Sequence, residues 1–137
     1  MAGTQIEIAR AFMSTYAEGD ADGLLGCLLP GWVVHERDGS ASSADDLAEI
    51  TREHAAAFPL KRFEYLQELE QGDRVAQFVR FTLVHSGDYA GMAPTGREVE
   101  LFEMIFHRFE QGLISESWRM TYPDSVREAL ADGEPGA

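Results

Sequence analysis

Two side chains that can exchange protons, Glu103 and His107, lie four residues apart in the run ELFEMIFHRF. Apolar and polar residues alternate there, and residues two apart in a strand share a face, so Glu103 and His107 lie on the same side. The opposite side of this strand is apolar and carries Phe102, Met104 and Phe106. A carboxylate near an imidazole can act as a general acid/base pair, and an apolar pocket raises the pKa of a glutamate toward neutrality. The competing interpretation places Glu103 at a rim or interface and His107 at the surface near a turn.

A further candidate for proton transfer is His35, which follows the short apolar run at residues 32–34. An imidazole titrates near neutrality, and Glu36 or Asp38 in the following loop could orient the ring. The alternative for His35 is a hydrogen-bonded core histidine. The single cysteine, Cys27, lies among leucines, and we interpret it as a small buried residue rather than a nucleophile.

The sequence lacks the residue patterns of metal sites, phosphate-binding loops and serine nucleophiles. The four histidines, at positions 35, 54, 85 and 107, are scattered, and no His-x-x-x-His or cysteine pair marks a metal site. Neither a phosphate-binding glycine loop nor a Gly-x-Ser-x-Gly serine elbow occurs in the sequence. We therefore expect no metal and no cofactor.

The elements that must position these side chains begin with helices. A capping-box spacing at Thr4 predicts a first helix that ends at Gly19. A short second helix is predicted over residues 21–29, and a third runs from a cap at Ser43 to about residue 57.

Strands follow the helices. A glycine-containing turn joins predicted strands at residues 62–70 and 74–85, and another joins strands at residues 99–109 and 113–122. A short strand at residues 32–35 precedes them, residues 38–40 are expected to be loop, and a short final helix is expected near residues 124–130. Helices first and antiparallel strands afterwards indicate an α+β fold with the helices on one face of the sheet.

Length and charge limit the classes of partner. A chain of 137 residues fits one domain that can bury a core and still leave a cavity. Its net charge of −13 disfavours nucleic acid and anionic membrane surfaces. No apolar run is long enough to span a bilayer, and the start of the sequence lacks a secretory signal pattern, so we expect a cytoplasmic protein.

The second half of the chain also carries short motifs in a fixed order. They are Gly72-Asp73-Arg74-Val75, His85, Gly91, Pro94-Thr95-Gly96-Arg97, Gly112, Ile114, Glu116 and Trp118. In order and spacing these motifs resemble those of the SnoaL-like polyketide cyclases, which belong to the NTF2-like group. The resemblance implies one α+β domain over residues 1–137, with N-terminal helices packed on a curved antiparallel sheet that encloses a conical pocket. It further implies a small hydrophobic substrate and a homodimer that buries the apolar strand face.

The resemblance also implies which residues face the pocket. Glu103, His107 and His35 would then be catalytic, and Tyr16, at the end of the first helix, would place its hydroxyl to hold a carbonyl or enolate oxygen. For Tyr16 the alternative is a core aromatic with its hydroxyl at the surface. The expected substrate-binding residues are Trp32, His54, Phe58, Phe78, Trp118, Met120 and Tyr122, the last three on the inner face of the final strand.

The chain departs from the family where the catalytic aspartate is expected, near the end of the last strand. Arg119 to Tyr122 contain no acid, and the first acid after them is Asp124. The family histidine of the preceding strand aligns with Ile105 rather than with His107. The family's acid/base pair is therefore displaced or absent.

Three functions follow as hypotheses. The first is a cofactor-independent cyclase or isomerase that acts on a polyketide-like or polycyclic intermediate by acid/base catalysis in an apolar pocket. The second is an epoxide hydrolase or epoxide-opening cyclase, which needs two carboxylates around an arginine such as Arg80 or Arg119. The third is a binding or accessory protein without catalytic activity, which the missing aspartate would favour.

Overall fold

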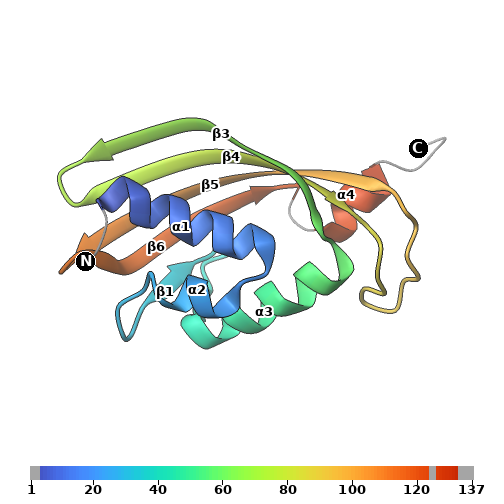
Figure 1. The fold of residues 1–137 in the computed structure, drawn as a ribbon, viewed down its shortest axis with the longest axis horizontal. Helices are drawn as coiled ribbons and strands as arrows, with labels where there is room; N and C mark the ends of the chain where they lie inside the picture. The colour runs from blue at the N-terminus through green and yellow to red at the C-terminus, as the bar shows by residue number, and fades with distance from the viewer. Residues whose placement is uncertain (1–3, 124–125, 133–137) are drawn as a thin grey trace.

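Six strands form one curved sheet, and helices cover one of its faces (Figure 1). The structure is a computed structural model that describes residues 4–123 and 126–132. Its helices are α1 (Gln5–Glu18), α2 (Ala21–Leu25), α3 (Ala44–Ala57) and α4 (Val126–Asp132). Its strands are β1 (Val33–His35), β2 (Ala41–Ser43), β3 (Leu60–Gln71), β4 (Arg74–Val84), β5 (Glu98–Glu110) and β6 (Leu113–Tyr122). The strand order is β2-β1-β6-β5-β4-β3, so the predicted α+β layout is confirmed.

Local signals set the ends of the main helices. Thr4 accepts a hydrogen bond from the backbone of Glu7 at the start of α1, and Gly19 ends that helix with a φ of +80°. Ser43 and Asp46 form a reciprocal capping box at the start of α3. None of the helices in the described part of the chain has the length and apolar character needed to cross a membrane.

The segments that follow α2 and β1 differ in part from the prediction. The second helix ends at Leu25 instead of continuing to residue 29. Beyond it, Leu28 forms a parallel bridge with Ile114, and the Leu29 amide donates to the Ile114 carbonyl over 2.9 Å. Pairing with β6 thus replaces the last helical turn. After the predicted loop the chain forms a short strand that was not predicted, β2, which pairs antiparallel with β1.

A bulge in the last hairpin decides which residues of β6 face the helices. At the turn, Glu110 pairs with Leu113 and Phe109 with Ile114, whereas beyond it Arg108 pairs with Glu116. One extra residue, Ser115, is therefore inserted into β6, and every later side chain changes face relative to a regular hairpin.

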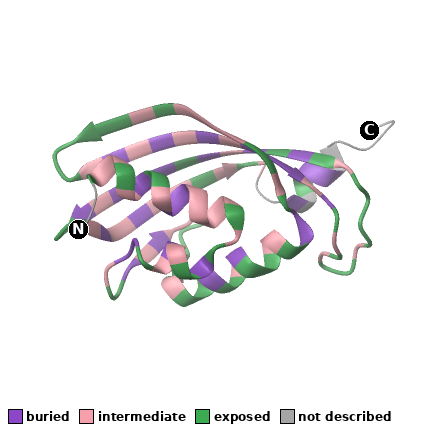
Figure 2. Ribbon diagram, in the orientation of Figure 1, coloured by how far each residue is buried: buried purple, intermediate pink, exposed green. Residues whose placement is uncertain are grey.

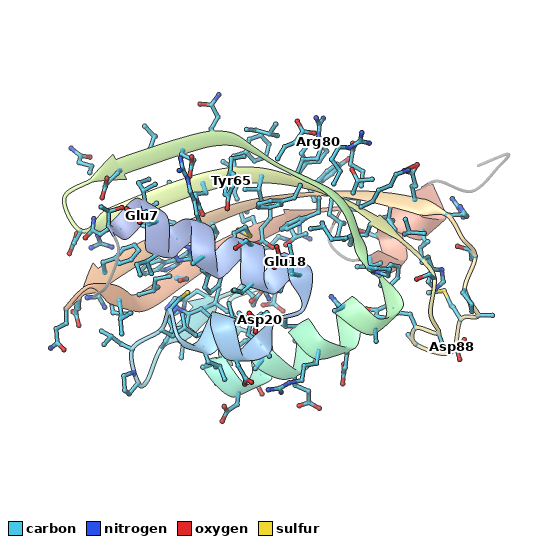
Figure 3. The ribbon with its side chains drawn as sticks, viewed as in Figure 1. Glu7, Glu18, Asp20, Tyr65, Arg80 and Asp88 are labelled. Carbon is cyan, nitrogen blue, oxygen red and sulfur yellow. The ribbon has the colours of Figure 1, made fainter. Side chains whose placement is uncertain are left out.

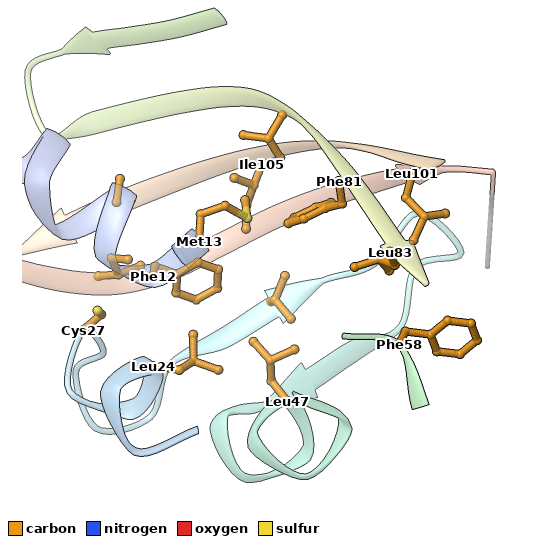
Figure 4. Packing of buried hydrophobic residues seen from close by; sticks show 14 of the residues in the cluster. Phe12, Met13, Leu24, Cys27, Leu47, Phe58, Phe81, Leu83, Leu101 and Ile105 are labelled. Atoms are coloured by element: carbon orange, nitrogen blue, oxygen red, sulfur yellow. The ribbon is translucent and has the colours of Figure 1, made fainter. Parts of the chain in front are cut away.

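The core lies between the helices and the concave face of the sheet. Alternate residues of β4 and β5 are buried, as the banding of the strands in Figure 2 shows. Phe12 and Met13 of α1 lie against this face, near Phe81 and Ile105 (Figure 4). Each such side chain contributes about 1.5–3 kcal/mol to folding through its burial. Cys27 belongs to the same core, and its burial raises the pKa of the thiol.

Candidate active site

A cavity of about 400 Å³ lies between the ends of α1 and α3 and the strands β4 to β6. Its walls are largely apolar and include Ile50, Phe58, Phe81, Leu83, Leu101 and Val126. A few polar side chains enter this apolar volume. Such a cavity fits a small hydrophobic ligand that the polar groups orient.

Glu103 of β5 is the buried carboxylate of this cavity, with 2% of its surface exposed. Its Oε1 accepts a long hydrogen bond of 3.5 Å from the Thr121 hydroxyl, and no described residue bonds to its buried Oε2. Burial raises the pKa of Glu103 to about 6, and the positive charge of Arg119 only partly opposes this shift. Glu103 is therefore suited to take up and release a proton near neutral pH.

Arg119 of β6 supplies the positive charge of the cavity. Its Nη2 lies 3.0 Å from Glu36 Oε1, and its Nε donates to Glu36 Oε2 over 3.2 Å. This two-point contact fixes the plane of the guanidinium. Although burial acts in the opposite direction, Tyr16, Glu103 and Glu36 raise the pKa of Arg119, so it stays charged.

Tyr16 lines the same cavity from the end of α1. The Arg119 guanidinium carbon lies 5.9 Å from the centre of its ring. Burial raises the pKa of Tyr16 to about 12, so its hydroxyl keeps its proton and can donate a hydrogen bond. A carboxylate, a guanidinium and a phenol thus enter one cavity.

A second polar pair lies on the helix side of the cavity. His54 of α3 and Tyr89 of the β4–β5 loop both line it, and His54 Nε2 lies 3.4 Å from the Tyr89 hydroxyl oxygen. The rings of both residues contact Phe58 edge-on. Burial lowers the pKa of His54, which favours the neutral imidazole.

Of the four predicted catalytic residues, the structure brings only Glu103 and Tyr16 together. His107 is fully buried in the core, where its Nδ1 lies 2.7 Å from Ser117 Oγ and its ring meets Phe12 edge-on. Burial lowers the pKa of His107 to about 3, so it is neutral. Its predicted orientation toward the helices is correct, but it does not line the cavity.

His35 lies on the other face of the sheet, so its predicted place in the pocket is wrong. Its Nε2 is 2.6 Å from Glu116 Oε2, and its ring stacks on Trp118. Residues of β1 alternate between the two faces, and Val34 occupies the inward position instead. Glu36, which we expected only to orient His35, contacts Arg119 at the cavity.

The predicted substrate-binding residues divide in the same way. His54 and Phe58 line the cavity. Trp32 lies in the core, where its Nε1 donates to Ser117. Four residues instead line grooves on the outer face, which is the face of the sheet away from the helices. They are Phe78, Trp118, Met120 and Tyr122.

The bulge at Ser115 explains the error on β6. Without it, Met120 would pair with Glu103 and share its face; with it, Thr121 does. Arg119 and Thr121 therefore reach the cavity.

Arg80, the other arginine considered for an epoxide site, lies on the outer face, where it binds Glu64 over 2.7 Å (Figure 3). Asp124 lies outside the described residues.

Sequence reasoning missed Tyr89 and the inward direction of Thr121. Tyr89 lies in an irregular loop, where no periodicity indicates direction. Among the described residues, no group of three or more histidine, cysteine, aspartate or glutamate side chains converges as metal ligands would.

Comparison with known proteins identifies relatives of the whole fold. The sequence profile of the SnoaL-like polyketide cyclase family matches residues 6–126. The structure resembles AclR from Streptomyces galilaeus, a proposed hydroxylase, with a TM-score of 0.80 and 22% identity, over 96% of this chain and 86% of AclR. It also resembles IdmH from Streptomyces antibioticus, a proposed polyketide cyclase, with a TM-score of 0.76 and 21% identity, over 91% of this chain and 96% of IdmH. No protein with a curated function matches the sequence significantly.

Proposed function

Because the chain belongs to the SnoaL-like polyketide cyclase family, we propose that it is a cofactor-independent cyclase or isomerase of a polyketide-like intermediate. The observation that carries this proposal is Glu103, a buried carboxylate that enters an apolar cavity together with Arg119 and Tyr16. Its pKa of about 6 leaves it mainly ionised at pH 7, so it can act as the base. His35 and His107 have no part in this mechanism.

The reaction begins when Glu103 removes a proton from the carbon next to a substrate carbonyl. The electron pair moves onto the carbonyl oxygen and forms an enolate. Arg119 and Tyr16 stabilise this oxygen by charge and by hydrogen bonding. In a cyclase, the enolate carbon then attacks a second carbonyl of the same molecule, and Glu103 returns its proton to the new alkoxide. In an isomerase, the proton returns to a different carbon, and in both cases the atoms of the substrate are conserved.

Proton exchange on a simple ketone tests this mechanism without the natural substrate. The probe is 1-tetralone, a neutral bicyclic ketone with exchangeable protons next to its carbonyl. We expect the protein to accelerate exchange of these protons in deuterated buffer, measured by NMR. Glu103→Gln should lower the rate by about a hundredfold or more, the usual contribution of a general base. A rate equal to that of buffer alone, or an unchanged rate in Glu103→Gln, would contradict the proposal.

One observation supports epoxide opening as a second candidate. Glu36 and Glu103 lie near Arg119 from different elements, which gives two carboxylates and an arginine around one volume. Glu103 would take a proton from water, whose oxygen attacks the epoxide carbon. The C–O bond breaks, Tyr16 protonates the departing oxygen, and Glu103 then reprotonates Tyr16. Formation of a diol from cyclohexene oxide, without exchange on 1-tetralone, would select this activity.

The third hypothesis, a binding or accessory protein, predicts neither exchange nor diol formation. Ligand binding in the cavity would then be the remaining activity. The buried Oε2 of Glu103 has no partner among the described residues, and a bound ligand would satisfy it under this hypothesis as well, so the exchange and diol assays decide between the hypotheses.

The outer face supports a homodimer as the assembly in which this activity operates. Every exposed large hydrophobic side chain of the described residues lies there: Leu69, Met104, Phe106, Met120 and Tyr122. All of these except Tyr122 line an apolar groove of about 490 Å³. Arginine–glutamate pairs such as Arg80–Glu64 and Arg108–Glu116 balance the charge on this face, although the chain carries −13 overall. Two copies can therefore meet through this face without strong repulsion.

A further inference from the structure

The His54–Tyr89 pair has no role in the proton transfers above, yet it lines the same cavity. His54 comes from α3 and Tyr89 from the β4–β5 loop, whereas Glu103 and Arg119 come from the sheet. Polar groups from two sets of elements thus line the cavity, and its apolar lining includes Phe81 and Leu101. A ligand held by its carbonyl near Arg119 would extend toward the His54–Tyr89 pair.

The geometry of the pair leaves its hydrogen-bonding capacity available. A separation of 3.4 Å between Nε2 and the phenol oxygen is longer than the usual 2.7–3.0 Å or so, so the bond is weak. Edge-on contacts with Phe58, at ring-centre distances of 6.4 Å for His54 and 5.0 Å for Tyr89, hold both rings in place. Phe58 is itself held from behind by stacking on His85 at 4.9 Å. The pair is therefore fixed in position but weakly bonded within itself.

The chemistry of the two groups limits what they can recognise. A neutral imidazole has one nitrogen that accepts a hydrogen bond, and a phenol can donate one. A ligand hydroxyl can donate to the first and accept from the second at the same time. A carbonyl can only accept, and a hydrocarbon can do neither, so the pair distinguishes a hydroxyl from both.

We propose that His54 and Tyr89 form a recognition site for a hydroxyl group at the end of the ligand remote from its reacting carbonyl. The preferred ligand is then a neutral cyclic ketone with a phenol or alcohol at its far end. This inference rests on the proposed function for the orientation of the ligand, since Arg119 and Tyr16 must hold the carbonyl. It assigns specificity, rather than chemistry, to the His54–Tyr89 pair.

Two ketones that differ by a single hydroxyl test the inference. The probes are 1-tetralone and 6-hydroxy-1-tetralone, whose hydroxyl lies on the ring edge away from the carbonyl. We expect the wild-type protein to bind the hydroxyl compound about tenfold more tightly, which corresponds to one net hydrogen bond in a buried site. Isothermal titration calorimetry gives the ratio of the two dissociation constants.

The ratio should fall to about one in Tyr89→Phe, which removes only the phenol oxygen, and in His54→Gln, which alters the acceptor. Tyr65→Phe is the matched control, because its hydroxyl bonds to the Arg10 carbonyl outside the cavity, and it should keep the wild-type ratio. Equal affinities in the wild type, no measurable binding of either ketone, or a ratio that survives in Tyr89→Phe would overturn the inference.

The same probes separate this inference from the proposed function. Proton exchange on 1-tetralone without a preference for the hydroxyl compound would remove the recognition site and leave the enzyme. A hydroxyl preference that Tyr89→Phe abolishes, without exchange on either ketone, would support the recognition site in a binding protein.

Discussion

Glu103 is the residue whose protonation the proposed reaction depends on. Its carboxylate form is the base, and burial raises its pKa to about 6. The exchange rate on 1-tetralone should therefore rise with pH, reach half its maximum near pH 6 and level off above about pH 7. Rates measured by NMR between pH 4.5 and 8 give the profile. A rate that is flat or falls over this range would show that Glu103 is not the base.

The same shift in pKa has a consequence for stability. The folded pKa of Glu103, about 6, exceeds its ordinary value of 4.5, so the fold favours the protonated form. The stabilising effect of this proton is complete below about pH 4.5 and is lost as pH rises through 6. Because glutamine resembles the protonated acid, Glu103→Gln should raise the free energy of unfolding at pH 8 by about 2 kcal/mol. Urea denaturation at pH 8 and at pH 4 should show the gain only at pH 8; an equal effect at both would refute this account.

His107 should affect stability in acid in the opposite sense. Its folded pKa of about 3 lies below the ordinary value of 6.5, so the fold favours the neutral ring. The stabilising effect of the neutral ring is therefore complete above about pH 6.5. As the pH falls from 6.5 toward 3, the free energy of unfolding drops by about 1.4 kcal/mol per pH unit, which amounts to several kcal/mol. In His107→Gln, which cannot titrate, the unfolding free energy should change less between pH 7 and 4 than in the wild type. The same pH dependence in both proteins would rule out this role for His107.

The candidate site shows how far single residues can be interpreted from sequence. The family resemblance indicates which face of β5 is the inner one, and the alternation correctly places Glu103 and His107 together on one face. The alternation cannot tell that Glu103 reaches the cavity and that Phe12 covers His107, because this depends on where α1 crosses the sheet. Arg119 was considered for an epoxide site, but its contact with Glu36 joins residues 83 positions apart, which no local pattern reveals.

At the scale of elements, the last hairpin limited the prediction most. Its turn and both strand ranges agree with the sequence pattern. Ser115 nevertheless adds a residue to β6 and moves Trp118, Met120 and Tyr122 to the outer face. Both faces of β6 carry large and polar side chains, so hydrophobic alternation does not reveal the insertion.

Contact between α1 and α3 at Gly19 positions the two helices that carry Tyr16 and His54. Gly19 has a φ of +80°, and an added Cβ would overlap the side chain of Ala55. Gly72 has a φ of +57°, but nothing lies near its Cβ position. Both Gly→Ala changes should cost about 1 kcal/mol through backbone strain, and Gly19→Ala should cost about 1–3 kcal/mol more through the overlap. Urea denaturation of the two variants measures the difference, and equal losses would show that α1 and α3 do not pack closely there.

For the whole molecule, the layered architecture was predictable because it depends on patterns repeated over many residues. Helix caps, apolar spacing and two glycine turns together specify helices on one face of an antiparallel sheet. The resemblance in motif order added the prediction that the sheet is curved and encloses a cavity. The short β2 and the parallel pairing of β1 with β6 were not predictable, because three-residue strands carry too little pattern and their partners lie far along the chain.

The outer face gives a prediction for the assembly. Met104 is 57% exposed at the centre of the apolar groove, so a charge there would be buried without a partner in a dimer. Met104→Glu should weaken dimerisation by at least about a hundredfold, because each copy contributes one such charge. Ala56→Glu adds the same charge on the exposed surface of α3 and should leave the association unchanged. Light scattering coupled to gel filtration over a range of concentrations measures the mass of each variant.

If the wild type is monomeric at all concentrations, or if Met104→Glu and Ala56→Glu dissociate alike, the outer face is not the dimer interface. Its exposed hydrophobic side chains would then need a different partner.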